Sequence, residues 1–280
     1  MSLPTVVTTE WLAAHLGEPD LRVIDATWYL PVLNRDAGAE YLTAHVPGAV
    51  YFDIDVIKDT TNPLPHMLPE ASGFAAAVGA LGVGEGDRVV VYGQKYLIAS
   101  ARVWWTFRVF GHDRVAVLDG GFPKWKAEGR PVESGAVTPR PGRFTARRRP
   151  DLVRDLARVR ANVDTRREQV VDARSHGRFA GTEPEPRAGV RSGHIPGSVC
   201  LPYDQLFRRE DGTLLPGPAL REVFDKAGIE SGRPIVTTCG SGVSAAVLAL
   251  GLHLLGRPEV AVYDGSWTEW GSRTDTPVDV

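Results

Sequence analysis

AHVPGAVYFDID (residues 44–55) and GHIPGSVCLPYD (residues 193–204) are two versions of one motif, and their pairing decides the fold. A short apolar run precedes each motif and ends in Asp-Ala, as VIDA at 23–26 and as VVDA at 170–173. The order of run and motif is the same in both halves of the chain. This order is the first indication that the sequence contains an internal repeat.

Two further blocks repeat in the same order. GDRVVVYG (86–93) is matched by GRPIVTTCG (232–240), and FGHDRVAVLDGGFPKW (110–125) is matched by LGRPEVAVYDGSWTEW (255–270). Each pair is separated by nearly the same number of residues as the pairs before it. Four matched blocks in an unchanged order predict two tandem domains, because a solenoid would repeat every 20 to 50 residues.

Within each copy, short runs rich in valine and isoleucine alternate with apolar segments of helical length. Continuous apolar strands separated by helices are typical of a parallel sheet covered on both faces. The predicted fold class is therefore α/β, with two similar domains at residues 1–130 and 151–280. The stretch between them, 131–150, is rich in Pro, Gly and Arg and predicts an interdomain linker.

The composition of the chain argues against several classes of partner and cofactor. The chain has 280 residues, 43% of them hydrophobic, and a formal net charge of -2, which argues against nucleic-acid or anionic membrane partners. It shows no apolar run of membrane-spanning length and no secretory signal. Two cysteines make no disulfide framework, so a cytoplasmic location is expected. Motifs for a metal or a nucleotide cofactor are missing, and neither is expected.

The two copies differ most at one loop. The second copy reads CGSGVSA from Cys239 to Ala245, between a strand and a helix, whereas the first copy reads GQKYLIA at 93–99. Cys239 follows the carboxyl end of a predicted parallel strand, where open α/β sheets bind ligands. A helix expected to begin near Val243 or Ser244 favours a thiolate there. We therefore predict that Cys239 is the nucleophile and that the first domain is non-catalytic.

Glycines at 240 and 242 permit the tight turn in which several backbone N–H groups face one anionic sulfur. The alternative is a buried cysteine that acts as a small hydrophobic residue, which does not explain the GSG that follows. Cys200, in contrast, lies in a segment that reads as a short buried strand. We predict that Cys200 is structural.

CGSGVSA, the segment GRFAGTEPEPRAGVRSGHIPGS (177–198) and YDGSWTEW (263–270) resemble the two-domain sulfurtransferases of the rhodanese superfamily. The resemblance covers nearly the whole chain and implies two rhodanese-like domains, of which only the second has the nucleophile. It implies that Cys239 carries sulfur as a persulfide. The loop is most similar to members that act on 3-mercaptopyruvate, since members that prefer thiosulfate read CRKGVTA. Lys95, in the first copy's loop, departs from the family pattern.

The donor follows from the charge of the loop. An Arg-Lys pair beside the cysteine would neutralise dianionic thiosulfate, but Gly240 and Ser241 occupy those positions here. A carboxylate donor needs its positive charge further away. The resemblance assigns that role to Arg178 and Arg187, and salt bridges to Glu183 or Glu185 are the alternative. Loop residues expected to bind substrate are Gly240, Gly242, Val243 and Ser244.

The resemblance also implies a relay in which Asp55 and His66, from a loop broken by prolines, act with Ser241. Histidine suits proton movement near neutral pH, and a carboxylate fixes its tautomer. His45 and His194, in the paired HxPG motifs, occur in both copies. Because the copy without a nucleophile also has one, we interpret them as structural turn residues.

The resulting hypothesis is sulfur transfer from 3-mercaptopyruvate to thioredoxin, a small thiol or cyanide, with release of pyruvate. A thiosulfate:cyanide sulfurtransferase is the nearest alternative. A cysteine phosphatase would need an arginine six residues after the cysteine, where the chain has Ala245. A regulatory binding module usually lacks the cysteine, which the second domain has.

Overall fold

The computed structural model describes residues 3–230 and 232–280, which form two compact units. The first unit comprises residues 1–60, 68–149 and 207–214, and the second comprises 61–67, 150–206 and 215–280. Each unit contains one five-stranded sheet, and all of the strand pairs within the two sheets are parallel. The prediction of two α/β domains with parallel sheets is confirmed.

The first sheet has the strand order β1-β5-β4-β2-β3. Its strands are β1 (Val6–Val7), β2 (Leu21–Asp25), β3 (Val50–Tyr51), β4 (Arg88–Tyr92) and β5 (Val115–Leu118). The helices of the first unit are α1 (Thr9–His15), α2 (Ala37–Thr43), α3 (Ala71–Ala80), α4 (Ile98–Val109) and α5 (Gly121–Ala127), with 3₁₀ turns at Pro31–Leu33 and Lys95–Leu97. The side chain of Lys95 lies outside the described part of the chain.

The second sheet repeats this order as β6-β10-β9-β7-β8. Its strands are β6 (Val153–Arg154), β7 (Gln169–Asp172), β8 (Val199–Cys200), β9 (Ile235–Thr238) and β10 (Ala261–Tyr263). The helices of the second unit are α6 (Leu156–Thr165), α7 (His176–Phe179), α8 (Gly217–Lys226), α9 (Ala245–Leu254) and α10 (Ser266–Ser272), with 3₁₀ turns at Pro150–Leu152 and Tyr203–Leu206.

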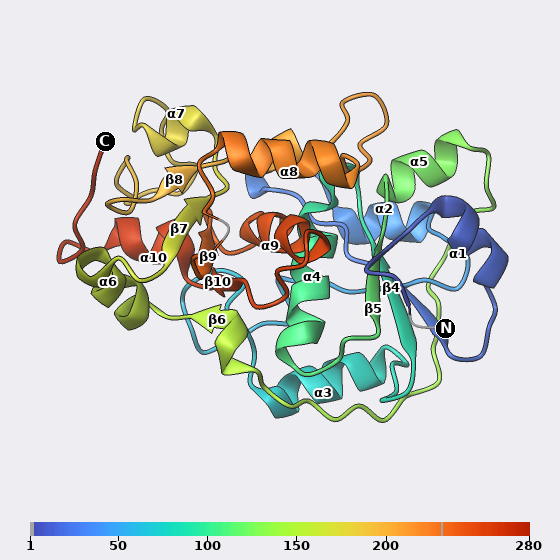
Figure 1. Ribbon diagram of the computed structural model, residues 1–280. Coiled ribbons are helices and arrows are strands. Elements are labelled where there is room, and N and C mark those ends of the chain that lie inside the picture. Colours follow the sequence, from blue (N-terminus) through green and yellow to red (C-terminus); the bar gives the residue numbers. More distant parts are fainter. Residues whose placement is uncertain (1–2, 231) are drawn as a thin grey trace. The chain divides into compact units, whose positions relative to one another are not determined.

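The strand order explains why helices cover both faces of each sheet. The chain crosses the first sheet in one direction from β1 to β2 to β3, and then returns through β4 to β5. Because crossovers between parallel strands are right-handed, reversing the direction moves the connecting helix to the opposite face. In the first unit, α4 packs on β4 and β5, and in the second, α9 packs on β9 and β10 (Figure 1).

Helices α4 and α9 are buried almost completely, which matches their apolar sequences. The strands that they cover are also buried on both faces, since every residue of β5, β9 and β10 is buried. Strands of this kind read as continuous valine and isoleucine runs rather than as alternating patterns. No helix in the described residues is long and apolar enough to cross a membrane.

Most of the predicted linker, 131–150, is hydrogen-bonded to the first unit. Its backbone N–H groups at Gly135, Gly142 and Arg149 donate to carbonyl groups of residues 42, 79 and 109 at 2.7 to 2.8 Å. Phe144 is buried among aromatic rings that include Phe74 and Phe107. The segment therefore packs along the first unit.

Candidate active site

Cys239 directly follows β9, the central strand of the second sheet. Strand β7 pairs with β9 on one side, with Asp172 opposite Thr238, and β10 pairs with β9 on the other side. The loops after β7 and β10 therefore lie at the same edge of the sheet as Cys239. In the first domain, Tyr92 pairs with Asp25 in the same way, so Gly93 occupies the place of Cys239.

The loop from Cys239 to Ser244 is a tight, buried turn. Cys239 is 2% exposed, Ser241 is 6% exposed and Val243 is 3% exposed. Gly242 has a φ of +73°, a conformation in which a side chain causes strain and glycine does not. Helix α9 begins at Ala245, one or two residues later than predicted. Its ten residues still direct a partial positive charge from the helix N-terminus toward the loop.

Ser266 fixes the backbone of Cys239 and was not predicted from the sequence. Its Oγ accepts a hydrogen bond from the Cys239 N–H at 3.2 Å and donates to the Tyr263 carbonyl at 2.8 Å. The neighbouring N–H of Trp267 donates to the Cys239 carbonyl at 2.9 Å. The first domain has the same bond from Phe122 to Gly93, but a glycine in place of the serine.

Arg178 and Arg187 both approach the loop. A Cβ atom at Gly240 would lie 3.0 Å from Nη2 of Arg178 and 3.9 Å from Nη1 of Arg187. The first of these distances is too short for an ordinary contact, so the absence of a side chain at 240 leaves room for the Arg178 guanidinium. The structure thus brings together the cysteine loop and the two arginines that the sequence analysis selected for a carboxylate.

Arg178 also forms the salt bridge that the sequence analysis named as the alternative. It lies in α7, which follows β7, and its Nη2 donates to Oε2 of Glu185 at 2.5 Å. Glu183 instead accepts a hydrogen bond from the hydroxyl of Ser175 at 2.7 Å. Since Nη2 of Arg178 contacts Glu185 and also faces Gly240, the salt bridge is compatible with a position beside the loop.

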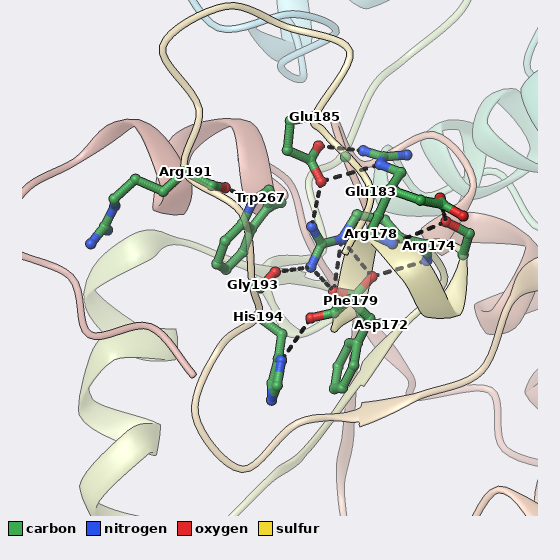
Figure 2. A network of polar contacts seen from close by, with 12 residues as sticks. Asp172, Arg174, Arg178, Phe179, Glu183, Glu185, Arg191, Gly193, His194 and Trp267 are labelled. Carbon is green, nitrogen blue, oxygen red and sulfur yellow. Dashed lines mark hydrogen bonds and ion pairs between the residues drawn. The ribbon is translucent and has the colours of Figure 1, made fainter. Parts of the chain in front are cut away.

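A chain of alternating charges extends from this salt bridge into the domain (Figure 2). Arg174 donates to Glu185 at 2.7 Å and to both carboxylate oxygens of Asp172, at 3.1 and 2.6 Å. The side chains of Arg174 and Asp172 are fully buried. The guanidinium of Arg174 also lies 4.5 Å from the ring centre of Trp267. The order Asp172–Arg174–Glu185–Arg178 leaves each buried charge beside an opposite one.

Cys200 is a poor candidate for a nucleophile. Burial, followed by the charge of Asp172, raises the pKa of the Cys200 thiol to about 12. Its Sγ lies 3.6 Å from the Arg174 carbonyl, as a weak donor. A thiol with this pKa is almost entirely protonated at neutral pH, and the thiol is much less nucleophilic than the thiolate.

The relay residues fall in different units. Asp55 belongs to the first unit, where it accepts a hydrogen bond from Nε1 of Trp28 at 2.7 Å and its side chain is 48% exposed. His66 and Ser241 belong to the second unit, and both are buried. His66 has a φ of +60°, which costs backbone energy in a residue other than glycine. The relay stays a prediction.

The two histidines of the HxPG motifs occupy matching positions. Nδ1 of His45 contacts the Tyr41 carbonyl at 2.7 Å, and Nδ1 of His194 contacts the Phe179 carbonyl at 2.8 Å. Each ring also stacks on the aromatic ring of the residue whose carbonyl it contacts. These contacts support a structural role. The described residues contain no group of three or more acidic, cysteine or histidine side chains that could hold a metal ion.

Comparisons with known proteins match both domains. A model of the rhodanese-like domain matches residues 8–128 and 155–273. The 3-mercaptopyruvate sulfurtransferase of Homo sapiens is 44% identical over 98% of this chain and 94% of its own length. Thiosulfate sulfurtransferase of Bos taurus is 45% identical, over 96% and 92%. The crystal structure of Escherichia coli SseA, described among the 3-mercaptopyruvate sulfotransferases, has a TM-score of 0.86 at 38% identity, over 94% and 98%.

Proposed function

Since the chain belongs to the rhodanese-like domain family over both of its domains, we propose that it transfers sulfur from 3-mercaptopyruvate to a thiol acceptor through a persulfide on Cys239. Relatives named for mercaptopyruvate and for thiosulfate are equally similar to it, so identity alone does not choose the donor. The observation that carries the choice is the loop. Gly240 and Ser241 carry no cation of their own, and the missing side chain at 240 leaves space for the guanidinium of Arg178, which is also paired with Glu185.

The first half of the reaction breaks a carbon–sulfur bond. The Cys239 thiolate attacks the thiol sulfur of 3-mercaptopyruvate and forms an S–S bond, while the electron pair of the C–S bond passes to the carbon skeleton as the pyruvate enolate. The proton of the donor thiol leaves the outer sulfur, so that the persulfide is anionic, and this proton balances the one that the enolate carbon takes up. Arg178 and Arg187 hold the carboxylate end of the donor. Backbone N–H groups of the Gly240–Ser244 loop stabilise the anionic persulfide, with glycine at 242 allowing the turn.

The enolate needs a proton on carbon to become pyruvate. Ser241 lies in the cysteine loop, and His66 is a buried residue of the same unit, which makes them our candidates for that step. Asp55 enters as the partner that the family resemblance implies for His66. His66→Gln should lower kcat with 3-mercaptopyruvate but not kcat with thiosulfate, because release of sulfite requires no protonation of carbon.

In the second half of the reaction, an acceptor thiolate attacks the outer sulfur of the persulfide and releases the Cys239 thiolate. Thioredoxin or a small thiol would serve as the acceptor, and cyanide would replace it in assays. Two cysteines are too few for a disulfide framework, which favours a reducing cytoplasm. We propose that compartment as the place of the reaction.

Mass spectrometry tests the proposal. Incubation with 3-mercaptopyruvate should add one sulfur atom to the peptide that contains Cys239, and the Cys239→Ser protein should gain none. Sulfur on another peptide would contradict the mechanism. A comparison of kcat/KM for 3-mercaptopyruvate and thiosulfate then identifies the donor, and a higher value for thiosulfate would favour the alternative function.

A further inference from the structure

Glu185 is held between two arginines at the edge of the candidate site. Its Oε1 accepts hydrogen bonds from Nη1 of Arg174 at 2.7 Å and from Nε of Arg178 at 3.1 Å. Its Oε2 accepts from Nη2 of Arg178 at 2.5 Å. The Glu185 side chain is only 4% exposed, compared with 22% for Arg178. Figure 2 shows the carboxylate between the two guanidinium groups.

Arg174 keeps Glu185 in a fixed place. Its guanidinium is fully buried and donates to Asp172, to Glu185 and to the Gly193 carbonyl. The first domain has Thr27 at the position of Arg174, since VIDAT there matches VVDAR here. Arg174, which holds Glu185, therefore has no counterpart in the first domain, whereas Asp172 is matched there by Asp25.

The position of Glu185 has an electrostatic consequence for the donor. Nη2 of Arg178 contacts Glu185 and also faces Gly240, so an anion that binds Arg178 beside the loop approaches the Glu185 carboxylate. A donor whose only charge is its carboxylate can place that charge on the arginine and keep a neutral sulfur group near Cys239. A compact dianion such as thiosulfate has a second charge that Glu185 repels, and water screens this repulsion weakly near buried groups.

We propose that Glu185 is a specificity-determining residue, which orients Arg178 toward the cysteine loop and selects donors with one negative charge over donors with two. This inference rests on the proposed sulfur transfer and adds the charge of the donor to it. Glu185 acts through Arg178 and through the local field, without touching the reacting sulfur.

Glu185→Gln tests the inference, and Glu183→Gln is its matched control. Both variants remove one negative charge from the same loop, but among the described contacts Glu183 pairs with Ser175, and Glu185 with the arginines. In Glu185→Gln, the ratio of kcat/KM for thiosulfate to that for 3-mercaptopyruvate should rise roughly 10-fold, mainly through KM. In Glu183→Gln, it should stay within about 2-fold, because the charge is further from Arg178.

An unchanged ratio in Glu185→Gln, or equal rises in both variants, would overturn the inference. Glu185→Asp provides a second variant, which keeps the charge and shortens the side chain. It should weaken both donors and leave their ratio low, whereas a raised ratio in Glu185→Asp would assign the selectivity to packing instead of charge. Thermal unfolding of each variant shows whether it is folded.

A binding measurement separates this inference from the proposed function. In a Cys239→Ser background, which cannot turn over, calorimetry would give the Kd of thiosulfate and of pyruvate with and without Glu185→Gln. Thiosulfate should bind roughly 10-fold more tightly in the double variant, and pyruvate, with one charge, should gain clearly less. Equal tightening of both ligands would contradict charge selection. Failure of the proposed function would appear separately, as a lack of turnover of 3-mercaptopyruvate by the unmodified enzyme.

Discussion

The hydroxyl of Ser266 accepts a hydrogen bond from the backbone N–H of Cys239 at 3.2 Å, and Ser266 does so from a left-handed conformation with a φ of +50°. Residues other than glycine rarely adopt this conformation, because Cβ crowds the backbone. The first domain has Gly121 at the matching position, with a φ of +58° and no hydroxyl. The serine is therefore strained where a glycine would not be, and its hydroxyl holds the nucleophile's backbone.

The first prediction separates these two properties of Ser266. Ser266→Ala keeps the strain and loses the hydroxyl, so the free energy of unfolding should fall by about 1–2 kcal/mol. Ser266→Gly should lose less, because glycine relaxes the backbone. Both variants should form the Cys239 persulfide more slowly, and to a similar degree. Chemical denaturation and single-turnover sulfur transfer measure the two effects, and full activity of Ser266→Gly would contradict the role of the hydroxyl.

Ser266 is a site residue whose role the sequence alone does not predict. The sequence selects Cys239, Arg178 and Arg187 through motifs that resemble a known family, and the folded chain brings the two arginines beside the cysteine loop, while their functional roles stay predictions. The role of Ser266 depends on β10 lying beside β9, a contact between residues 27 positions apart that no local pattern reveals. One signal was present, since YDGS in the second copy replaces LDGG in the first, and a serine in place of a glycine in a repeat indicates a special role.

The charge network of Asp172, Arg174, Glu185 and Arg178 also depends on contacts that the sequence does not reveal. The substitution of Arg174 for the first domain's Thr27 is visible when the repeats are aligned, but its partners Asp172 and Glu185 are identified only by the folded chain. Helix α9 starts one or two residues after the predicted position, a difference of the size by which definitions of a helix end vary. Residues 131–150 are predicted to be a linker because they lack apolar periodicity, and the backbone hydrogen bonds that join residues 131–149 to the first unit require no periodic pattern.

The second prediction concerns the space above Gly240. Gly240→Ala would place a Cβ atom 3.0 Å from Nη2 of Arg178, so the guanidinium must shift by a few tenths of an ångström, away from its place beside the loop. We expect KM for 3-mercaptopyruvate to rise about 5-fold, which corresponds to a loss of about 1 kcal/mol of binding. Gly217→Ala is the control, because a Cβ atom there has no neighbour within 4 Å. Equal KM values in the two variants would show that Arg178 tolerates the added methyl group.

The third prediction concerns the reactivity of the two thiols. With a pKa of about 12, Cys200 has roughly one molecule in ten thousand as thiolate at pH 8. Brief treatment of the native enzyme with iodoacetamide at pH 8 should therefore alkylate Cys239 and leave Cys200 unmodified. Peptide mass spectrometry identifies the site, and unfolding in urea, which exposes Cys200, should make both react. Alkylation of native Cys200 at a rate similar to that of Cys239 would contradict its structural role.

The last prediction compares Asp25 with Asp172, which end matching strands of the two domains and are both buried. Burial raises the pKa of Asp25 above its usual range. A carboxyl group whose pKa is higher in the folded state binds protons more readily there, so its charge lowers stability as the pH rises above the unfolded pKa. The Asp172 carboxylate, in contrast, faces the buried cation of Arg174 at 2.6 Å.

Asp25→Asn should therefore raise the free energy of unfolding at pH 7, by about 1.4 kcal/mol for each unit of pKa shift removed, and this gain should shrink as the pH falls toward the usual range of aspartate. The amide oxygen can still accept the hydrogen bond from the Thr27 N–H. Asp172→Asn should lower stability by about 3 kcal/mol, because it leaves a buried guanidinium with one anionic partner fewer. Urea unfolding at pH 7 and pH 5 measures both. Equal losses in the two variants would show that the two buried carboxylates play the same part, and would remove the electrostatic distinction between the domains.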